Sequence, residues 1–189
     1  MPRFIELIIV LMLLLITMPL MFLISLGIWM SGGGPIIFSQ QRVGKSGKLF
    51  VLYKFRTMVV GSDAMACVAN SELLKPRLDT RITGLGFWLR RFSLDELPQL
   101  INVIRGEMAL VGPRPHLPAE LTIYEEQHFQ RLTVKPGITG LWQVSGRSEK
   151  TLSEQLELDL KYIADRSLML DILIVVKTLP AVLFGRGAY

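Results

Sequence analysis

The feature that most constrains this chain is a long apolar segment near its N-terminus. Residues 4–30 are almost entirely Leu, Ile, Met, Val and Phe, and no charged residue occurs between Glu6 and Arg42. A helix rises about 1.5 Å per residue, so the segment is long enough to cross a hydrocarbon core of roughly 30 Å. It is too long, and its basic start too weak, for a cleaved signal peptide. We therefore expect residues 1–30 to anchor the chain in a membrane.

The path of this anchor depends on Pro19, which lies near its middle. Proline lacks an N–H and clashes with the preceding turn, so it kinks or breaks a helix. A kinked helix could span the membrane, and a broken one could re-enter and return to the same side. Proline is common in spanning helices, so this residue taken alone favours spanning. Thr17 lies close enough to satisfy a freed backbone group.

Charge and residue usage narrow the classes of function. The formal net charge is +5, which favours anionic partners such as nucleic acid, phosphorylated substrates or anionic lipid. Of the 21 Lys and Arg, all but Arg3 follow the apolar segment, which indicates a cytoplasmic location for the rest of the chain. A single cysteine, Cys67, excludes an intrachain disulfide and a cysteine-rich zinc site, and two histidines argue against a histidine-rich metal site.

Past a glycine-rich linker at 31–35, the sequence predicts a β-hairpin. Apolar runs at 36–38 and 49–53 flank the turn sequence GKSG at 44–47. A P-loop would need glycine at position 39, which is Ser39, so we interpret GKSG as a turn. The hairpin is basic, and Lys54 and Arg56 fall on one side of its second strand.

The remaining segments predict mainly helices. Residues 61–80 are expected to be a loop, and 81–92 either a core helix or an amphipathic segment lying on the membrane. We expect 118–131 to be a polar helix and both His116 and His128 to be surface residues. A capping box at Thr151 predicts an amphipathic helix, and 168–184 predicts a helix that is buried or rests on the membrane. The fold class is therefore α+β and mostly α.

Two adjacent carboxylates, Asp95 and Glu96, stand out near the centre of the chain. Apolar residues at i, i+3, i+4 and i+7 predict a helix that begins close to Asp95 and ends at Gly106, with Pro98 in its first turn. A carboxylate at a helix start is stabilised in its ionised form, as a nucleophile or magnesium ligand must be. The alternative is structural, because Ser93 and Glu96 also fit a capping box.

An arginine between two prolines follows this helix. The backbone on both sides of Arg114 is restricted by Pro113 and Pro115, which indicates either a rigid turn or an arginine held in place to grip phosphate. Carboxylates, constrained cations and a membrane anchor together fit phosphoryl transfer, which needs cations, a positioned nucleophile and usually magnesium. Aspartate can itself be that nucleophile.

Five ordered motifs make the chain recognisable. They are YKFRTM at 53–58, SLDELPQL at 93–100, GPRP at 112–115, KPGITG at 135–140 and GR at 146–147. In this order they resemble the bacterial sugar transferase family, the monotopic phosphoglycosyl transferases that start bacterial glycan assembly. The resemblance runs from the N-terminal segment to the last residue.

The resemblance implies transfer of a sugar-1-phosphate from a UDP-sugar to undecaprenyl phosphate. Asp95 would attack the sugar-proximal phosphate, expel UMP and carry the phosphosugar, with Mg²⁺ bridging Asp95 and the diphosphate and Glu96 orienting the pair. Arg114 and Arg147 would hold phosphate. The other residues that the resemblance places in the substrate site are Lys54, Arg56, Arg90, Pro113 and Pro115.

The resemblance also implies a topology and a location. Relatives anchor through a re-entrant helix broken at a Ser-Pro pair, where this chain has Met18-Pro19, so Thr17 would supply the missing side-chain bond. Residues 31–189 would form a catalytic domain at the cytoplasmic face of the bacterial inner membrane. The ending GRGAY at 185–189 weakly favours galactose or glucose in an exopolysaccharide or O-antigen type of glycan. Whether the chain forms a homo-oligomer is left open.

Two rival hypotheses belong to other classes. A membrane-tethered basic protein could bind nucleic acid or anionic lipid without catalysis, but the sequence has no basic-aromatic stripe or nucleic-acid-binding module, so we expect no nucleic-acid partner. A structural membrane protein could use its charges only to cap helices and contact lipid. That second hypothesis gives no reason for Asp95, Glu96 and the 112–115 motif to occur together.

Overall fold

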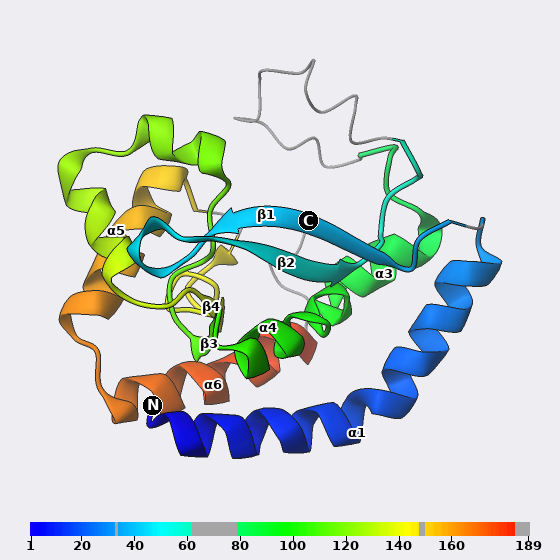
Figure 1. Ribbon diagram of the computed structural model, residues 1–189, viewed down its shortest axis with the longest axis horizontal. Coiled ribbons are helices and arrows are strands. Elements are labelled where there is room, and N and C mark those ends of the chain that lie inside the picture. Colours follow the sequence, from blue (N-terminus) through cyan, green and yellow to red (C-terminus); the bar gives the residue numbers. More distant parts are fainter. Residues whose placement is uncertain (33, 62–78, 148–149, 184–189) are drawn as a thin grey trace.

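The structure is a computed structural model that describes residues 1–32, 34–61, 79–147 and 150–183. Its α-helices are α1 (Arg3–Met30), α3 (Gly84–Arg91), α4 (Gln99–Arg105), α5 (Leu152–Ala164) and α6 (Leu168–Leu183). Its strands are β1 (Ile37–Val43), β2 (Leu49–Phe55), β3 (Ala109–Val111) and β4 (Gly137–Thr139). Short 3₁₀ helices are η1 (Lys45–Gly47), η2 (Leu94–Glu96), η3 (Pro118–Ile123) and η4 (Glu126–Thr133). The expected α+β class with a helical majority is confirmed (Figure 1).

The N-terminal segment forms one helix, with Pro19 inside it. The helix bends about half way along, so that its second half turns toward α3 (Figure 1). By length and composition α1 could cross a membrane. The Thr17 hydroxyl donates to the Leu13 carbonyl over 2.7 Å, whereas the carbonyl that Pro19 deprives of its i→i−4 donor is that of Leu15. Thr17 therefore makes a side-chain bond to the helix backbone but does not satisfy the carbonyl that Pro19 frees, and a re-entrant path stays a prediction.

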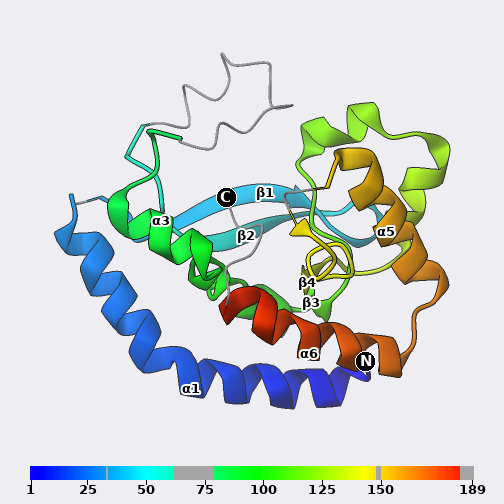
Figure 2. The same ribbon diagram turned by 180° about the vertical axis from the view of Figure 1, so that it is seen from behind.

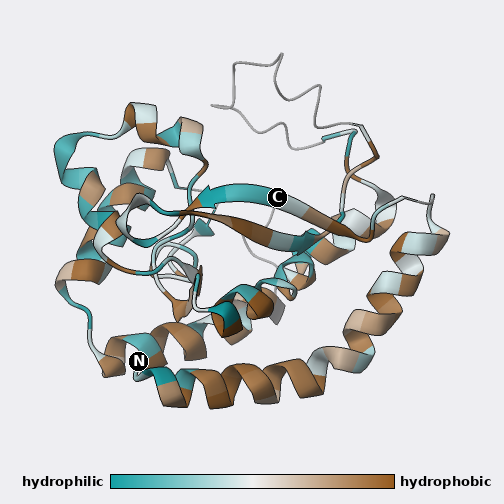
Figure 3. Ribbon diagram, in the orientation of Figure 1, coloured by the Kyte–Doolittle hydropathy of each residue, from teal (hydrophilic) through white to brown (hydrophobic). Residues whose placement is uncertain are grey.

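One side of α1 packs against the rest of the protein. Val10 is fully buried in the main core, and Ile24 and Ile28 lie in a second cluster with Phe55 and Leu89. The other sides carry exposed Leu, Ile, Met and Phe. Figure 2 shows α6 alongside the first half of α1, and Figure 3 shows that hydrophobic residues dominate both helices.

The predicted hairpin is confirmed and is longer than the apolar runs indicated. Strands β1 and β2 pair antiparallel from Ile37 opposite Phe55 to Val43 opposite Leu49. The turn contains Ser46 and Gly47 with positive φ values of 57° and 74°, a conformation that glycine tolerates best. The GKSG sequence therefore acts as a turn and not as a phosphate-binding loop.

A second, parallel pair of strands was not expected. Ala109 pairs with Gly137, and Val111 pairs with Thr139. A Cβ on Gly137 would lie 2.1 Å from the Gly112 nitrogen, so only glycine permits this approach. The pair brings the 112–115 motif against the 135–140 motif. Strands of three residues are too short for a period-2 pattern, so sequence periodicity could not reveal them.

For α3 and α6 the sequence left open a buried core helix or an amphipathic helix with an exposed apolar side, and both helices have a buried side and an exposed apolar side. In α3, Leu89 is buried while Phe87 and Trp88 are about half exposed, so the helix has a core side and an apolar outer side. In α6, Ile174 is fully buried and Val176 is exposed. The capping box at Thr151 is confirmed, because its hydroxyl accepts a bond from the Glu154 amide at the start of α5.

Some expectations were wrong or fall outside the described residues. Residues 118–131 do not form one helix, because extended backbone at Tyr124 and Glu125 separates η3 from η4. Both histidines are buried, His116 beside the bridge to Val43 and His128 accepting a bond from the Glu125 amide. Cys67, most of the 61–80 loop and the chain end at 185–189 lie outside the described part of the chain.

Candidate active site

Asp95 lies in the three-residue helix η2 that precedes α4. Ser93, just before it, adopts a left-handed conformation with φ of 53°. The N-cap of α4 is Pro98, which makes no side-chain cap. The expected helix start at Asp95 and the capping box between Ser93 and Glu96 are therefore wrong, while the predicted end at Gly106, with φ of 80°, is confirmed. Freed from capping, both carboxylates are available to other partners.

Burial dominates the electrostatics of Asp95. The residue is only 7% exposed, and desolvation raises its pKa from the usual 3.8 to about 6. Lys54 and Arg90 act in the opposite direction, while the neighbouring charge of Glu96 adds to the increase. We expected the helix start to keep this carboxylate firmly ionised. Instead, burial places its pKa close to neutrality, which is the range where a group can readily gain and lose charge.

Unlike Asp95, Glu96 has a lowered pKa, because cations from three parts of the chain stabilise its ionised form. The Lys54 Nζ on β2 lies 2.6 Å from Glu96 Oε1 and 3.9 Å from Asp95 Oδ2. Burial tends to raise the pKa of Glu96, but Lys54, Arg114 and Arg147 together lower it below its usual value. The two adjacent carboxylates thus have pKa values shifted in opposite directions, a pattern typical of sites where neighbouring acids have different roles.

Two further arginines flank this pair. The Arg90 Nε on α3 donates to the Thr57 hydroxyl over 2.9 Å, and burial lowers its pKa while Asp95 counteracts that effect. The Arg147 Nη2 lies 3.4 Å from the Ser93 hydroxyl. Burial lowers the pKa of Arg147 too, against the opposing charge of Glu96. Arg90 therefore lowers the pKa of Asp95, and Arg147 lowers the pKa of Glu96.

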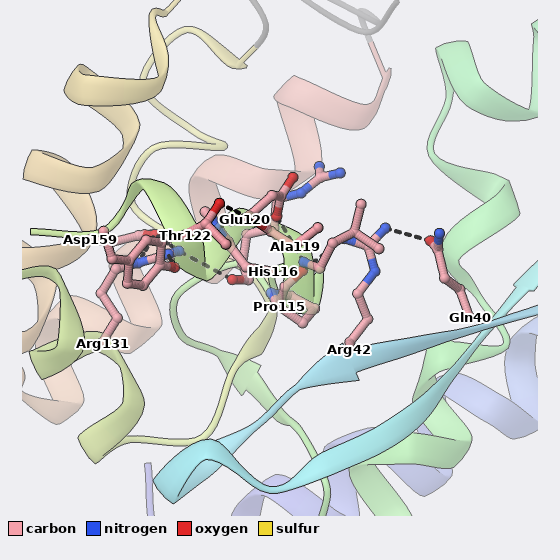
Figure 4. Close-up of polar contacts among 12 residues, drawn as sticks. Gln40, Arg42, Pro115, His116, Ala119, Glu120, Thr122, Arg131 and Asp159 are labelled. Atoms are coloured by element: carbon pink, nitrogen blue, oxygen red, sulfur yellow. Dashed lines mark hydrogen bonds and ion pairs between the residues drawn. The ribbon is translucent and has the colours of Figure 1, made fainter. Parts of the chain in front are cut away.

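The backbone around Arg114 is fixed by three separate bonds. The Gly137 amide donates to the Pro113 carbonyl, Arg131 to the Arg114 carbonyl and Arg42 to the Pro115 carbonyl, over 2.8, 3.1 and 3.2 Å. In Figure 4, Arg131 and Arg42 lie on either side of Pro115. The Arg114 guanidinium lies over the Trp142 ring, 5.8 Å from its centroid. This rigid segment supports a preset arginine, and its phosphate-binding role stays a prediction.

A pocket is lined by Glu96, the second of the two carboxylates, and by residues from distant segments. The ten residues that line it are Arg42, Leu52, Lys54, Glu96, Gln99, Arg114, Pro115, Gly137, Ile138 and Gln143. Sequence reasoning assigned no role there to Gln99 or Gln143, although both fall within or beside motifs that carried the resemblance. Each is a polar amide between apolar neighbours in the sequence, which is a signal that could have singled them out.

Arg56, another predicted site residue, lies just past the end of the second strand of the hairpin. It follows Phe55, the last residue of β2, and among the described residues no ion pair joins it to Asp95 or Glu96. Its guanidinium lies against Gly34 in the linker after α1. The strand ends at Phe55, so its side-chain alternation does not extend to Arg56 and does not pair the two cations.

The donor set bears on the predicted magnesium ion. Across the described residues, no group of three or more His, Cys, Asp or Glu side chains could hold a metal. Mg²⁺ is commonly bound through one or two carboxylates together with substrate phosphates, and does not need a closed protein cage. Asp95 fits that mode, because Lys54 and Arg90 do not fully offset the cost of ionising this buried carboxyl and a bound cation would offset it further. The site thus fits a cation that is shared with a phosphate-bearing substrate.

Known proteins resemble this chain along nearly all its length. A sequence profile described as "Bacterial sugar transferase" matches residues 1–185. The exopolysaccharide production protein ExoY of Rhizobium meliloti (strain 1021) is 40% identical over 186 residues, which cover 93% of this chain and 82% of that protein. The undecaprenyl-phosphate galactose phosphotransferase of Salmonella typhimurium is 43% identical over 188 residues, 94% of this chain and 39% of that longer protein.

A third relative carries a different sugar in its name. The UDP-glucose:undecaprenyl-phosphate glucose-1-phosphate transferase of Xanthomonas campestris pv. campestris is 45% identical over 179 residues, 90% of this chain and 36% of that protein. The chain thus spans most of ExoY and well under half of the two longer relatives. With a profile match over residues 1–185 and this level of identity to ExoY, the chain belongs to the bacterial sugar transferase family.

Proposed function

We propose that this protein is a phosphoglycosyl transferase that moves a sugar-1-phosphate from a UDP-sugar to undecaprenyl phosphate. The observation that carries the proposal is Asp95, a buried carboxylate with a pKa raised to about 6 that lies 3.9 Å from Lys54, which lines a pocket together with Glu96 and Arg114. Family membership supplies the chemical context, because relatives are named as undecaprenyl-phosphate galactose or glucose phosphotransferases.

In the first half-reaction, an oxygen of ionised Asp95 forms a bond to the sugar-proximal phosphorus of the donor. The bond from that phosphorus to the bridging oxygen breaks, and UMP leaves with the bridging oxygen and its electron pair. The product is an aspartyl phosphosugar. Lys54 and Arg90 favour the ionised state of Asp95 that this attack requires. Arg114 and Arg147, which already oppose the charge of Glu96, compensate the charge of the donor phosphates.

In the second half-reaction, a phosphate oxygen of undecaprenyl phosphate attacks the same phosphorus. The bond to the Asp95 oxygen breaks, which regenerates the carboxylate and yields a sugar linked to the lipid by a diphosphate. Because both steps put charge on oxygens around one phosphorus, a single set of fixed cations serves both. Glu96 stays ionised against Lys54 and holds that lysine between the two carboxylates.

Mg²⁺ is the proposed cofactor, with Asp95 as its protein ligand. When bound, it would supply positive charge to the diphosphate and lower the cost of ionising Asp95. The chain's own contribution is to position Asp95 through the η2 turn and to hold Lys54 2.6 Å from Glu96 and 3.9 Å from Asp95, so that Lys54 favours ionised Asp95 from beyond hydrogen-bond distance.

The proposal also places the reaction at a membrane. The long apolar helix α1 supports membrane association, and the excess of Lys and Arg after it supports a catalytic domain on the cytoplasmic face of the bacterial inner membrane. A re-entrant path through the bend at Pro19 would keep both ends of α1 on that face. There the UDP-sugar arrives from the cytoplasm and the lipid phosphate from the bilayer.

The test is release of UMP by purified protein in detergent with Mg²⁺ and undecaprenyl phosphate. UDP-galactose, UDP-glucose and an N-acetylated UDP-sugar are offered separately, because the relatives' names include both galactose and glucose. Asp95→Asn removes the nucleophile, and Asp165→Asn, at an exposed position after α5, is the matched control. UMP from the wild type and the control, together with none from Asp95→Asn, supports the proposal. Normal turnover by Asp95→Asn would overturn it.

A further inference from the structure

A buried ion pair joins η4 to α5 and takes no part in the chemistry described so far. Arg131 on η4 is 4% exposed, and Asp159 on α5 is 1% exposed. The Arg131 Nε donates to Asp159 Oδ2 over 3.0 Å, and Nη2 of the same guanidinium donates to the same oxygen. Figure 4 shows Arg131 and Asp159 at one end of a polar cluster whose other end is Arg42 with its partner Gln40.

Arg131 also connects this pair to the segment that carries Arg114. Its Nη2 donates to the Arg114 carbonyl over 3.1 Å, and its Nη1 contacts the Tyr124 hydroxyl. The guanidinium therefore links α5 and Tyr124 to the backbone of the residue whose side chain lines the pocket with Lys54 and Glu96. No ion pair joins Arg131 directly to Asp95 or Glu96 within the described ranges, whereas its bond to the Arg114 carbonyl connects it to a residue that lines the pocket.

Arginine is chemically suited to this connection. Its planar guanidinium carries five N–H donors in fixed directions, so it can hold Asp159, Tyr124 and the Arg114 carbonyl together. Lysine carries the same charge on a single nitrogen and cannot reproduce that geometry. A buried Arg–Asp pair is a poor source of stability compared with packed apolar side chains, because desolvation offsets most of the attraction. Stability alone therefore explains this pair poorly.

We propose that Arg131, oriented by Asp159, is a positioning residue that fixes the place and direction of Arg114 for binding the phosphates of the nucleotide sugar. The inference rests on the proposed function and extends it to residues far from the reacting carboxylate. Small displacements of a group that binds a reacting phosphate are costly, since about 1 Å of misplacement can reduce a rate by roughly 100-fold. Arg42, which donates to the Pro115 carbonyl, holds the other side of the same segment.

The test is a double-mutant cycle between Arg131→Lys and Arg114→Ala. Turnover is read as kcat/KM for the UDP-sugar, and affinity for UDP with Mg²⁺ is measured in parallel, so that a slow Arg114→Ala enzyme still yields a value. In the wild-type background Arg131→Lys is expected to lower kcat/KM by about 10-fold or more. In the Arg114→Ala background the same change is expected to have less than about a 3-fold effect, because contacts acting through one residue are not additive.

Two further variants separate positioning from general damage. Asp159→Asn keeps the shape of the side chain but loses its charge, and should show the same dependence on Arg114 if Arg131→Lys does not fold. Asp171→Asn removes another 1% exposed carboxylate, on α6, which accepts a bond from Tyr162 and does not contact Arg114. Any loss it causes should be equal in both Arg114 backgrounds. Thermal unfolding of each variant reports the structural cost separately.

The outcomes distinguish this inference from the proposed function. A wild type that neither releases UMP from any donor nor binds UDP overturns the proposed function. An active wild type in which Arg131→Lys and Asp159→Asn reduce turnover by the same factor with and without the Arg114 side chain overturns only the positioning role. Effects confined to the background that retains Arg114 support both.

Discussion

The energetic cost of keeping Asp95 buried can be worked out and measured. Its pKa rises from 3.8 to about 6 on folding, and one pKa unit corresponds to about 1.36 kcal/mol, so ionised Asp95 costs the folded state roughly 3 kcal/mol. Between those two pKa values the folded protein binds more protons than the unfolded chain, so stability falls as pH rises from about 4 to about 6. Above that window the full cost is present.

Asp95→Asn removes this cost, because an amide does not ionise. The variant should lose turnover yet gain stability relative to the wild type, and the gain should grow by about 2.5 kcal/mol between pH 4 and pH 8. The comparison with the wild type is necessary because burial also raises the pKa of Asp159 to about 6, so both carboxyls contribute to the wild-type curve. Subtracting the variant's curve isolates Asp95.

The assay is urea unfolding in detergent micelles, without divalent cations, followed by tryptophan fluorescence across this pH range. Asp165→Asn is the control, since its exposed carboxyl should produce a difference that barely changes with pH. If Asp95→Asn differs from the wild type by the same amount at pH 4.5 and pH 8, or is relatively less stable at pH 8, then burial does not control this carboxyl. The assignment of Asp95 as a carboxyl whose pKa is raised by burial would then be refuted.

Three other perturbations follow from single contacts. Because Lys54 lowers the pKa of Asp95, Lys54→Met should reduce UMP release and move the rise of kcat/KM with pH above its wild-type midpoint; an unmoved midpoint would contradict the pairing. Gly137→Ala places a Cβ 2.1 Å from the Gly112 nitrogen and should destabilise the protein by about 3 kcal/mol or more in urea unfolding, whereas Gly84→Ala, with open space around it, should change little; equal effects would contradict the close approach. Thr151→Ala should lose about 1 kcal/mol of stability with the α5 cap, and Thr151→Ser should recover most of it.

Local sequence patterns were sufficient for several parts of this protein. The uncharged apolar run predicted α1, the GKSG turn between apolar runs predicted the β1–β2 hairpin, and the capping box at Thr151 predicted α5. Each of these depends on interactions between residues that are close along the chain. Asp95, Glu96 and Arg114 could also be identified as candidate site residues from local sequence. The two carboxylates are adjacent, and Arg114 lies between two prolines.

Tertiary structure alone decided the properties that give those residues their chemistry. The charge state of Asp95 depends on burial by segments far away in sequence, and this reversed the expectation drawn from a helix start. The parallel pairing of β3 with β4 joins two motifs across a long connection and leaves no periodic trace in three-residue strands. The buried pair of Arg131 and Asp159 likewise joins residues from separate elements. Desolvation and long-range pairing are set by the packed whole, so no local pattern encodes them.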